Sequence, residues 1–188
     1  CLIYVPCGTL DIYKTAWSKH ASRIQYEPLE YNITGNVNNE AAGNVQIPQN
    51  KCEDVIAIPN YGYHFTQWSD GNTDNPRIAQ ITQDTTFTAE FAKNSYAIST
   101  ISANPEWGTT AGDTTALYLE EVEISAIPNY GYHFVRWNDG NTSNPRTVTV
   151  TTNETFTATF AKDIYSITKN AEHGSISGNS SAEYLDFV

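Results

Sequence analysis

The chain has 188 residues and a formal net charge of −11 at pH 7. This acidity argues against nucleic acid or an anionic membrane surface as a partner, because both favour clusters of Lys and Arg. No apolar stretch reaches the roughly 18 residues of a membrane-spanning helix, so we expect no membrane insertion in this segment. Abundant Thr, Tyr, Ile and Val, with Asn and Gly at turns, predict a mainly β fold.

Residues 1–30 are predicted to form one strand and one short helix. Residues 3–6, Ile-Tyr-Val-Pro, have the composition of a strand. Thr9 is placed to act as the N-cap of a helix over residues 10–22, in which Tyr13 and Trp17 share one face. These elements are too few for an independent core, so we interpret the segment as the end of a preceding domain or a cap on the next one.

The cysteines Cys1, Cys7 and Cys52 leave two interpretations open. In an extracellular protein, a disulfide between Cys7 and Cys52 would tie the first segment to the second. Free thiols without a role fit the sequence equally well.

Residues 58–93 and 127–162 are two copies of one sequence block. At an offset of 69 positions, 24 of the 36 residues are identical. The upstream residues match more loosely, with a four-residue gap in the first copy. Such self-similarity indicates tandem repeats, which we expect to form an extended array. We therefore divide the chain into a segment 1–30, repeat 1 over 31–93, repeat 2 over 94–162 and a third unit over 163–188.

Each repeat is predicted to contain about five to six short strands. In residues 156–160, Phe156, Ala158 and Phe160 alternate with Thr, which is typical of a strand with one buried face. Residues 122–126 and 147–150 alternate in the same way.

The strand over residues 131–137 is followed by a turn with the sequence Asp-Gly-Asn-Thr. Strict alternation places Tyr132 and Phe134 on one face of this strand and Trp137 on the other. Neither repeat contains a convincing helical period of apolar residues.

Residues 163–188 repeat only the opening of the unit, and Tyr184-Leu185 corresponds to Tyr118-Leu119. We expect a third repeat that is cut short, in a parent protein that is longer. Its predicted strands, Tyr165–Thr168 and Ser175–Gly178, should pack on repeat 2 or pair with another chain.

The Gly-Tyr-x-Phe-x-x-Trp core, with an upstream Tyr-x-Ile and a final Phe-x-x-x-Phe, resembles the Listeria–Bacteroides B-repeat family in its divergent internalin B form. The matching residues of repeat 1 are Tyr31, Ile33, Gly43, Pro59, Gly62, Tyr63, Phe65, Trp68, Phe87 and Phe91. Those of repeat 2 are Tyr96, Ile98, Gly108, Pro128, Gly131, Tyr132, Phe134, Trp137, Phe156 and Phe160.

The resemblance implies a secreted or cell-surface bacterial protein whose repeats, of a β-grasp-like kind, serve as stalk or adhesive modules. This sequence departs from the better-known form because it has no helix-like stretch between the Trp turn and the last strand. Residues 3–24 separately resemble the closing segment that comes after leucine-rich repeats in Bacteroides surface antigens.

The sequence offers little that favours catalysis. His64 and His133 occupy the same place in both repeats, whereas a catalytic site is normally single, so we interpret them as structural or surface residues. No metalloprotease, serine hydrolase or phosphate-loop motif is present. The Asp-Gly-Asn turns lack the run of alternating acids that a dedicated Ca²⁺ loop shows. We therefore expect no enzyme activity, no cofactor and no metal.

Four aromatic residues are the candidate binding residues: Tyr61 and Trp68 in repeat 1, Tyr130 and Trp137 in repeat 2. If exposed, they could stack on sugar rings or anchor a protein partner. For the Trp residues, filling a small core is the favoured interpretation. The leading hypothesis is a non-enzymatic, extracellular stalk or adhesion module that meets a host or cell-surface protein or glycan. The alternative is a carbohydrate-binding array that uses these four residues.

Overall fold

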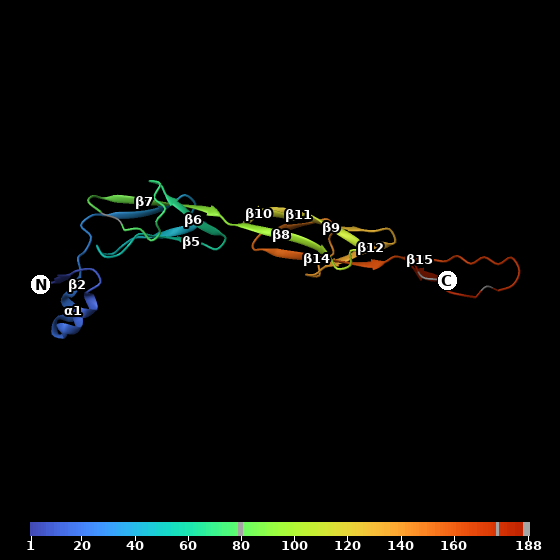
Figure 1. Cartoon of the computed structure of the whole chain (residues 1–188), viewed down its shortest axis with the longest axis horizontal. Helices are drawn as coiled ribbons and strands as arrows, with labels where there is room; N and C mark the ends of the chain where they lie inside the picture. The colour runs from blue at the N-terminus through green and yellow to red at the C-terminus, as the bar shows by residue number, and fades with distance from the viewer. Residues whose placement is uncertain (79–80, 176, 186–188) are drawn as a thin grey trace. The chain divides into compact units, whose positions relative to one another are not determined.

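The structure, a computed structural model, describes residues 1–78, 81–175 and 177–185. The chain is mainly β, as predicted, and divides into two compact units, residues 1–94 and 95–188 (Figure 1). Unit 1 contains the N-terminal segment and repeat 1, and unit 2 contains repeat 2 and the residues after it. None of the helices in the described ranges has the length and apolarity needed to cross a membrane.

The N-terminal segment is a parallel strand pair joined by a helical connection. Strand β1 (Ile3–Val5) is followed by helix α1 (Leu10–Ala16), the 3₁₀ helix η1 (Ser18–Arg23) and strand β2 (Ile24–Tyr26), and β1 pairs with β2 in parallel. The rings of Tyr13 and Trp17 meet edge to face at 5.6 Å, as the helical spacing predicts.

The α-helix is shorter than predicted, because the backbone leaves the α region at Trp17 and tightens into η1. Thr9 is the N-cap residue, but its hydroxyl donates to the Pro6 carbonyl instead of capping the helix.

Repeat 2 contains more strands than predicted. They are β8 (Ser95–Ser102), β9 (Gly108–Ala111), β10 (Thr114–Leu117), β11 (Glu121–Pro128), β12 (Tyr132–Trp137), β13 (Arg146–Thr149) and β14 (Glu154–Lys162). One sheet has the order β10-β8-β14-β12 and the other β13-β11-β9.

Repeat 1 is a reduced version of the same arrangement. Its strands are β3 (Ile33–Val37), β4 (Gly43–Gln46), β5 (Ile56–Pro59), β6 (Tyr63–Trp68) and β7 (Thr85–Lys93). They form the sheets β3-β7-β6 and β4-β5. The described part of repeat 1 has no counterpart of β10.

In each repeat the first strand and the last strand lie side by side in parallel: β3 with β7 and β8 with β14. A parallel pair of this kind also occurs in β-grasp folds. The described residues of both repeats contain no helix, however, so the helix that a β-grasp lays across its sheet is missing.

The core of each repeat follows the predicted alternation. Phe156, Ala158 and Phe160 are buried on β14, and the intervening Thr residues are half-buried. Ile124 of β11 and Val148 of β13 face them from the second sheet. The equivalent core of repeat 1 is centred on Phe87, Ala89 and Phe91.

One predicted orientation is wrong. Alternation places Trp137 on the face opposite Phe134, but its ring packs against Phe134 at 5.3 Å. The cause is a β-bulge: the register of β12 on β14 shifts between Phe134 and Arg136. A bulge inserts one extra residue and so exchanges the two faces beyond it. The same shift occurs in repeat 1 between Phe65 and Gln67.

The described residues after repeat 2 contain a two-stranded hairpin whose Tyr184 contacts repeat 2. Strand β15 (Ile164–Ser166) pairs with β16 (Ser181–Glu183), in the register that β8 and β10 use. The Tyr184 ring lies directly on Gly131, where a Cβ would approach it to 2.3 Å. Packing on repeat 2 is therefore confirmed for Tyr184, whereas the residues of β15 and β16 themselves are mostly exposed. The second strand lies later than the predicted Ser175–Gly178, of which residue 176 is outside the described part.

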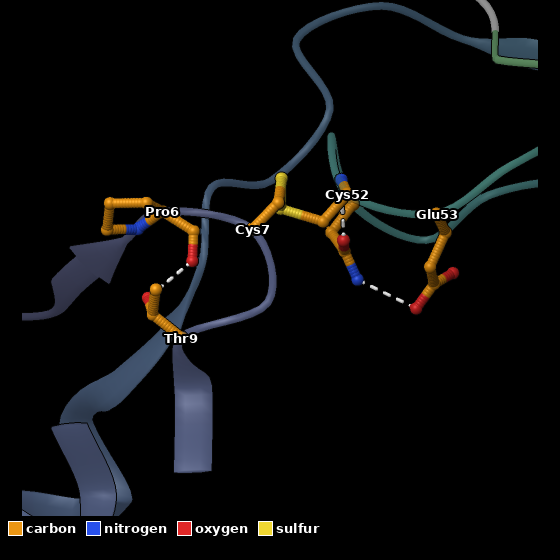
Figure 2. The surroundings of a disulfide bond; sticks show 6 residues. Pro6, Cys7, Thr9, Cys52 and Glu53 are labelled. Carbon is orange, nitrogen blue, oxygen red and sulfur yellow. Dashed lines mark hydrogen bonds between the residues drawn. A yellow bond between two sulfur atoms is a disulfide. The ribbon is translucent and has the colours of Figure 1, made fainter. Parts of the chain in front are cut away.

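Of the two interpretations of the cysteines, the structure contains the disulfide. Cys7 and Cys52 are bonded, and Cys1 is a free, exposed thiol. Figure 2 shows this bond between the loop that precedes α1 and the loop between β4 and β5. Backbone contacts reinforce the link, since the Lys51 N–H donates to the Glu27 carbonyl at 3.0 Å.

We expect the double variant Cys7→Ser, Cys52→Ser to destabilise unit 1 by about 3 kcal/mol, because the open chain gains conformational freedom when unfolded. Unit 2 should be unaffected. Amide hydrogen exchange, followed by mass spectrometry of peptides from each unit, would measure both, with Cys1→Ser as the matched control. Equal exchange in residues 24–59 of the double variant and the control would contradict the expectation.

Candidate functional site at the aromatic turn

The turn after Trp68 and Trp137 is a packed structure in both repeats. The Trp side chains are 1% and 0% exposed. Each indole N–H donates across the turn, from Trp68 to the Asp74 carbonyl at 2.8 Å and from Trp137 to the Ser143 carbonyl at 3.1 Å. The favoured core interpretation of these two residues is confirmed, and neither ring presents a face to solvent.

An Arg–Asp pair covers the Trp side of the core. In repeat 1 the Arg77 guanidinium binds the Asp70 carboxylate through two hydrogen bonds, of 3.1 and 2.9 Å. It also lies over the Trp68 and Phe87 rings, 5.6 and 5.1 Å from their centroids. Repeat 2 pairs Arg146 with Asp139, where a single guanidinium nitrogen donates to both carboxylate oxygens, and the guanidinium lies over Phe156. The planar guanidinium suits both contacts.

An Asn side chain joins this turn to the second sheet. The Asn75 amide accepts from the Ala57 N–H at 2.8 Å and donates to the Ala57 carbonyl at 2.7 Å. Asn144 binds Ala126 in the same manner in repeat 2. Each Asn precedes a Pro through a cis peptide bond. The turn is therefore held to strand β5 or β11 by backbone-like hydrogen bonds.

The carboxylates of the turn are ionised and internally engaged. The hydrogen bond from Arg77 lowers the pKa of Asp70, helped by the Asn72 N–H. At Asp139 partial burial raises the pKa, but the Arg146 and Asn141 hydrogen bonds together outweigh it, so the net pKa is lowered. These oxygens are thus committed to donors within the turn, and the described residues hold no cluster of three or more His, Cys, Asp or Glu side chains suited to a metal.

Tyr61 and Tyr130 lie at the start of the repeated block and are well exposed, at 68% and 83%. Tyr130 and Tyr132 both meet the Tyr184 ring edge to face, at 5.6 and 5.4 Å. Trp107 stacks on Tyr132 at 5.3 Å. Unit 2 therefore carries an aromatic surface around Tyr130, to which Trp107 and Tyr184 contribute. The sequence did not single out Trp107, because repeat 1 has Ala42 at the equivalent position, and it marked Tyr184 only as the counterpart of Tyr118.

His64 and His133 are exposed residues of β6 and β12. Their Nδ1 atoms lie 2.8 Å from Asn94 Oδ1 and Asp163 Oδ1, beyond the last strand of each repeat. This position matches the predicted structural or surface role. Arg77, Arg146, Asn75 and Asn144 were not singled out in the sequence, although both copies contain Asn-Pro-Arg at the same distance after Trp.

We expect the Arg–Asp pairs to make the stability of both repeats sensitive to acid. Because folding lowers the pKa of Asp70 and Asp139, their contribution is fully present above the unfolded value of 3.8 and is lost as the pH falls through the folded value. The variant Asp70→Asn, Asp139→Asn should be less stable than wild type at pH 7 and lose less stability between about pH 5 and pH 2.

Denaturant unfolding over this pH range would measure the difference. The matched control is Asp11→Asn, Glu172→Gln, which removes two exposed carboxylates elsewhere. If the turn variant and the control showed the same slope of stability against pH, the pairs would not contribute.

Comparison with known proteins supports the repeat assignment. The family model for the divergent InlB B-repeat domain matches the chain twice, over residues 29–95 and 99–164. No curated protein and no solved structure matches the chain. Repeats of this type are typical of bacterial surface proteins. The two matches cover most of the sequence and include both Trp turns. The chain therefore belongs to the divergent InlB B-repeat family.

Proposed function

We propose that this chain is a non-enzymatic module of a bacterial cell-surface or secreted protein, in which the repeats act as a stalk or adhesion segment. The observation that carries the proposal is that the side chains shared by the two repeats make their hydrogen bonds inside the repeat. The Trp, Arg and Asp of the shared block make hydrogen bonds within the turn, and the Asn binds the second sheet. Near-identity of the two blocks therefore follows from a shared fold, without a shared reaction.

Two further features support an extracellular location. The disulfide between Cys7 and Cys52 is of the kind that persists in oxidising compartments. The family is typical of bacterial surface proteins. A net charge of −11 also favours a solvated, non-aggregating surface.

If the proposal is right, brief protease treatment of intact bacteria that express this protein should release peptides from residues 31–162. A cytoplasmic protein of the same cells serves as the control, and its peptides should be absent. Appearance of repeat peptides only after cell lysis would overturn the surface location.

The second candidate function is glycan binding. Because Trp68 and Trp137 are buried, this candidate now depends on Tyr61 and Tyr130, whose exposure favours it. An exposed aromatic ring next to other rings can stack on the apolar face of a sugar. Around Tyr130, Trp107 and Tyr184 extend the aromatic surface.

A glycan array probed with the whole chain separates the two candidates. For a stalk we expect no saturable binding. Binding that Tyr130→Ala abolishes, while Ile164→Ala leaves it intact, would favour the glycan-binding candidate. Ile164 is a suitable control because it is also strongly exposed, at 70%, but not aromatic. Thermal unfolding of both variants would verify that unit 2 remains folded.

A further inference from the structure

The two repeats differ most at the outer edge of their first strand. In repeat 2 strand β10 covers this edge: Thr114 lies opposite Ile98, and Leu117 lies opposite Ser95, in antiparallel register. One position further along, the Asp113 carboxylate accepts from the Thr100 N–H at 2.7 Å and from its hydroxyl at 2.6 Å. The edge of β8 is thus closed by a strand and then by a carboxylate.

The described residues of repeat 1 contain neither of these closing elements. Between Gly43 and Ile58 there are 58 − 43 = 15 positions, whereas the equivalent residues Gly108 and Ile127 are 127 − 108 = 19 positions apart. The four absent residues correspond to residues 113–116, which include Asp113 and most of β10. Within the described ranges, β3 pairs with β7 alone.

The backbone of β3 presents hydrogen-bonding groups to this open edge. The Asn32 N–H points toward β7, because it donates to Asp84, which directly precedes that strand. The equivalent Ala97 N–H donates to Asn153 in repeat 2. Successive N–H groups of a strand point to opposite edges, so those of Ile33 and Gly35 point away from β7, toward the open edge. Burial agrees: Ile98 is 2% exposed and Thr100 7%, whereas Ile33 is half-buried and Gly35 exposed.

The loop that would have to close the edge is held elsewhere. Cys52 is bonded to Cys7, and the Lys51 ammonium pairs with Glu27 and Glu30 at 2.9 and 3.3 Å. A hollow of about 250 Å³ opens between this loop and the start of β3, lined in part by Tyr31 and Pro48. In repeat 2 the residues equivalent to Tyr31 and Glu30 lie opposite Ala116 and Leu117.

We propose that the open edge of β3 in repeat 1 is a binding site for an extended peptide of another protein. The peptide adds as an antiparallel strand, as β10 does in repeat 2. Its chemistry follows from β10: a carboxylate side chain placed on the Gly35 N–H, then small or β-branched residues opposite Ile33 and Tyr31. Strand addition of this kind gains its affinity from main-chain hydrogen bonds and its specificity from side-chain positions.

Gly35 stands where repeat 2 has Thr100. A Cβ at this position would approach the Val45 side chain to 2.8 Å, so the packing of β4 against β3 requires glycine. Where Thr100 offers a backbone N–H and a hydroxyl, Gly35 offers the N–H alone.

The test uses the whole chain and a synthetic peptide with the sequence of residues 113–118, Asp-Thr-Thr-Ala-Leu-Tyr. In NMR titration we expect saturable shifts at the amides of Ile33 and Gly35, and none at Ile98 and Thr100, whose edge is already closed. Methylation of the peptide nitrogen at Ala, which faces the β3 edge, should weaken binding about tenfold. Methylation at the second Thr, which faces away, should change it little.

A variant of the protein provides a second, independent test. Insertion of Asp-Thr-Thr-Ala between Ile47 and Pro48 restores the length of repeat 2 and should close the edge, so peptide binding is lost. Circular dichroism and thermal unfolding would show whether this variant folds. If it does not, the two methylated peptides still decide the question.

Three outcomes would overturn the proposal. The first is the absence of saturable shifts at Ile33 and Gly35. The second is equal binding of the two methylated peptides. The third is that shifts at these amides appear on concentrating the chain alone, with sedimentation showing a dimer, in which case a second copy is the occupant of the edge.

Discussion

Burial of one Trp per repeat is the constraint on which the rest of each repeat depends. A β unit of this size has a small core, so one large aromatic side chain supplies much of it. Truncating such a residue removes about 3–5 kcal/mol, against a total stability of about 5–15 kcal/mol for a domain. The bulge brings Trp68 or Trp137 to the buried face. The Arg then covers the ring, the Asp holds the Arg, and the Asn attaches the turn to the second sheet. The contacts of the Arg and the Asp therefore depend on the buried position of the Trp.

This dependence explains which features could be predicted from the sequence. The alternation of Phe156, Ala158 and Phe160 predicted the last strand and its buried face. The side on which Trp137 lies could not be obtained in this way, because a bulge is an insertion in the pairing and leaves no mark in the alternation of apolar residues. The exposure of Tyr61 and Tyr130 could not be obtained from alternation either, because each lies two positions before a strand residue, Tyr63 or Tyr132, and so has the same phase. They are exposed because they lie in the turn before the strand.

Apolar alternation could not predict a strand that contains mainly polar or small residues. Strand β10 contains Thr114 and Thr115 and covers an edge without filling the core, so it has no apolar periodicity. Its Asp113 cap is visible only as contacts in space. The disulfide was one of two open interpretations, since pairing depends on the distance between two loops, which no local pattern of residues encodes. The N-terminal helix was shorter than its apolar spacing suggested, because the backbone at Trp17 departs from helical angles.

The pairing of the first and last strands of each repeat has a mechanical consequence. β8 enters repeat 2 and β14 leaves it, and the two run in parallel with five residue pairs in register, from Ile98–Glu154 to Ser102–Ala158. Tension applied through the chain pulls the start of β8 and the end of β14 in opposite directions along their common axis. The hydrogen bonds between them are then loaded together, in shear, and must break at once for the repeat to extend. An antiparallel pair at the same place would open one bond at a time. Within repeat 1, β3 and β7 form the same kind of parallel pair, so its hydrogen bonds are loaded in shear as well.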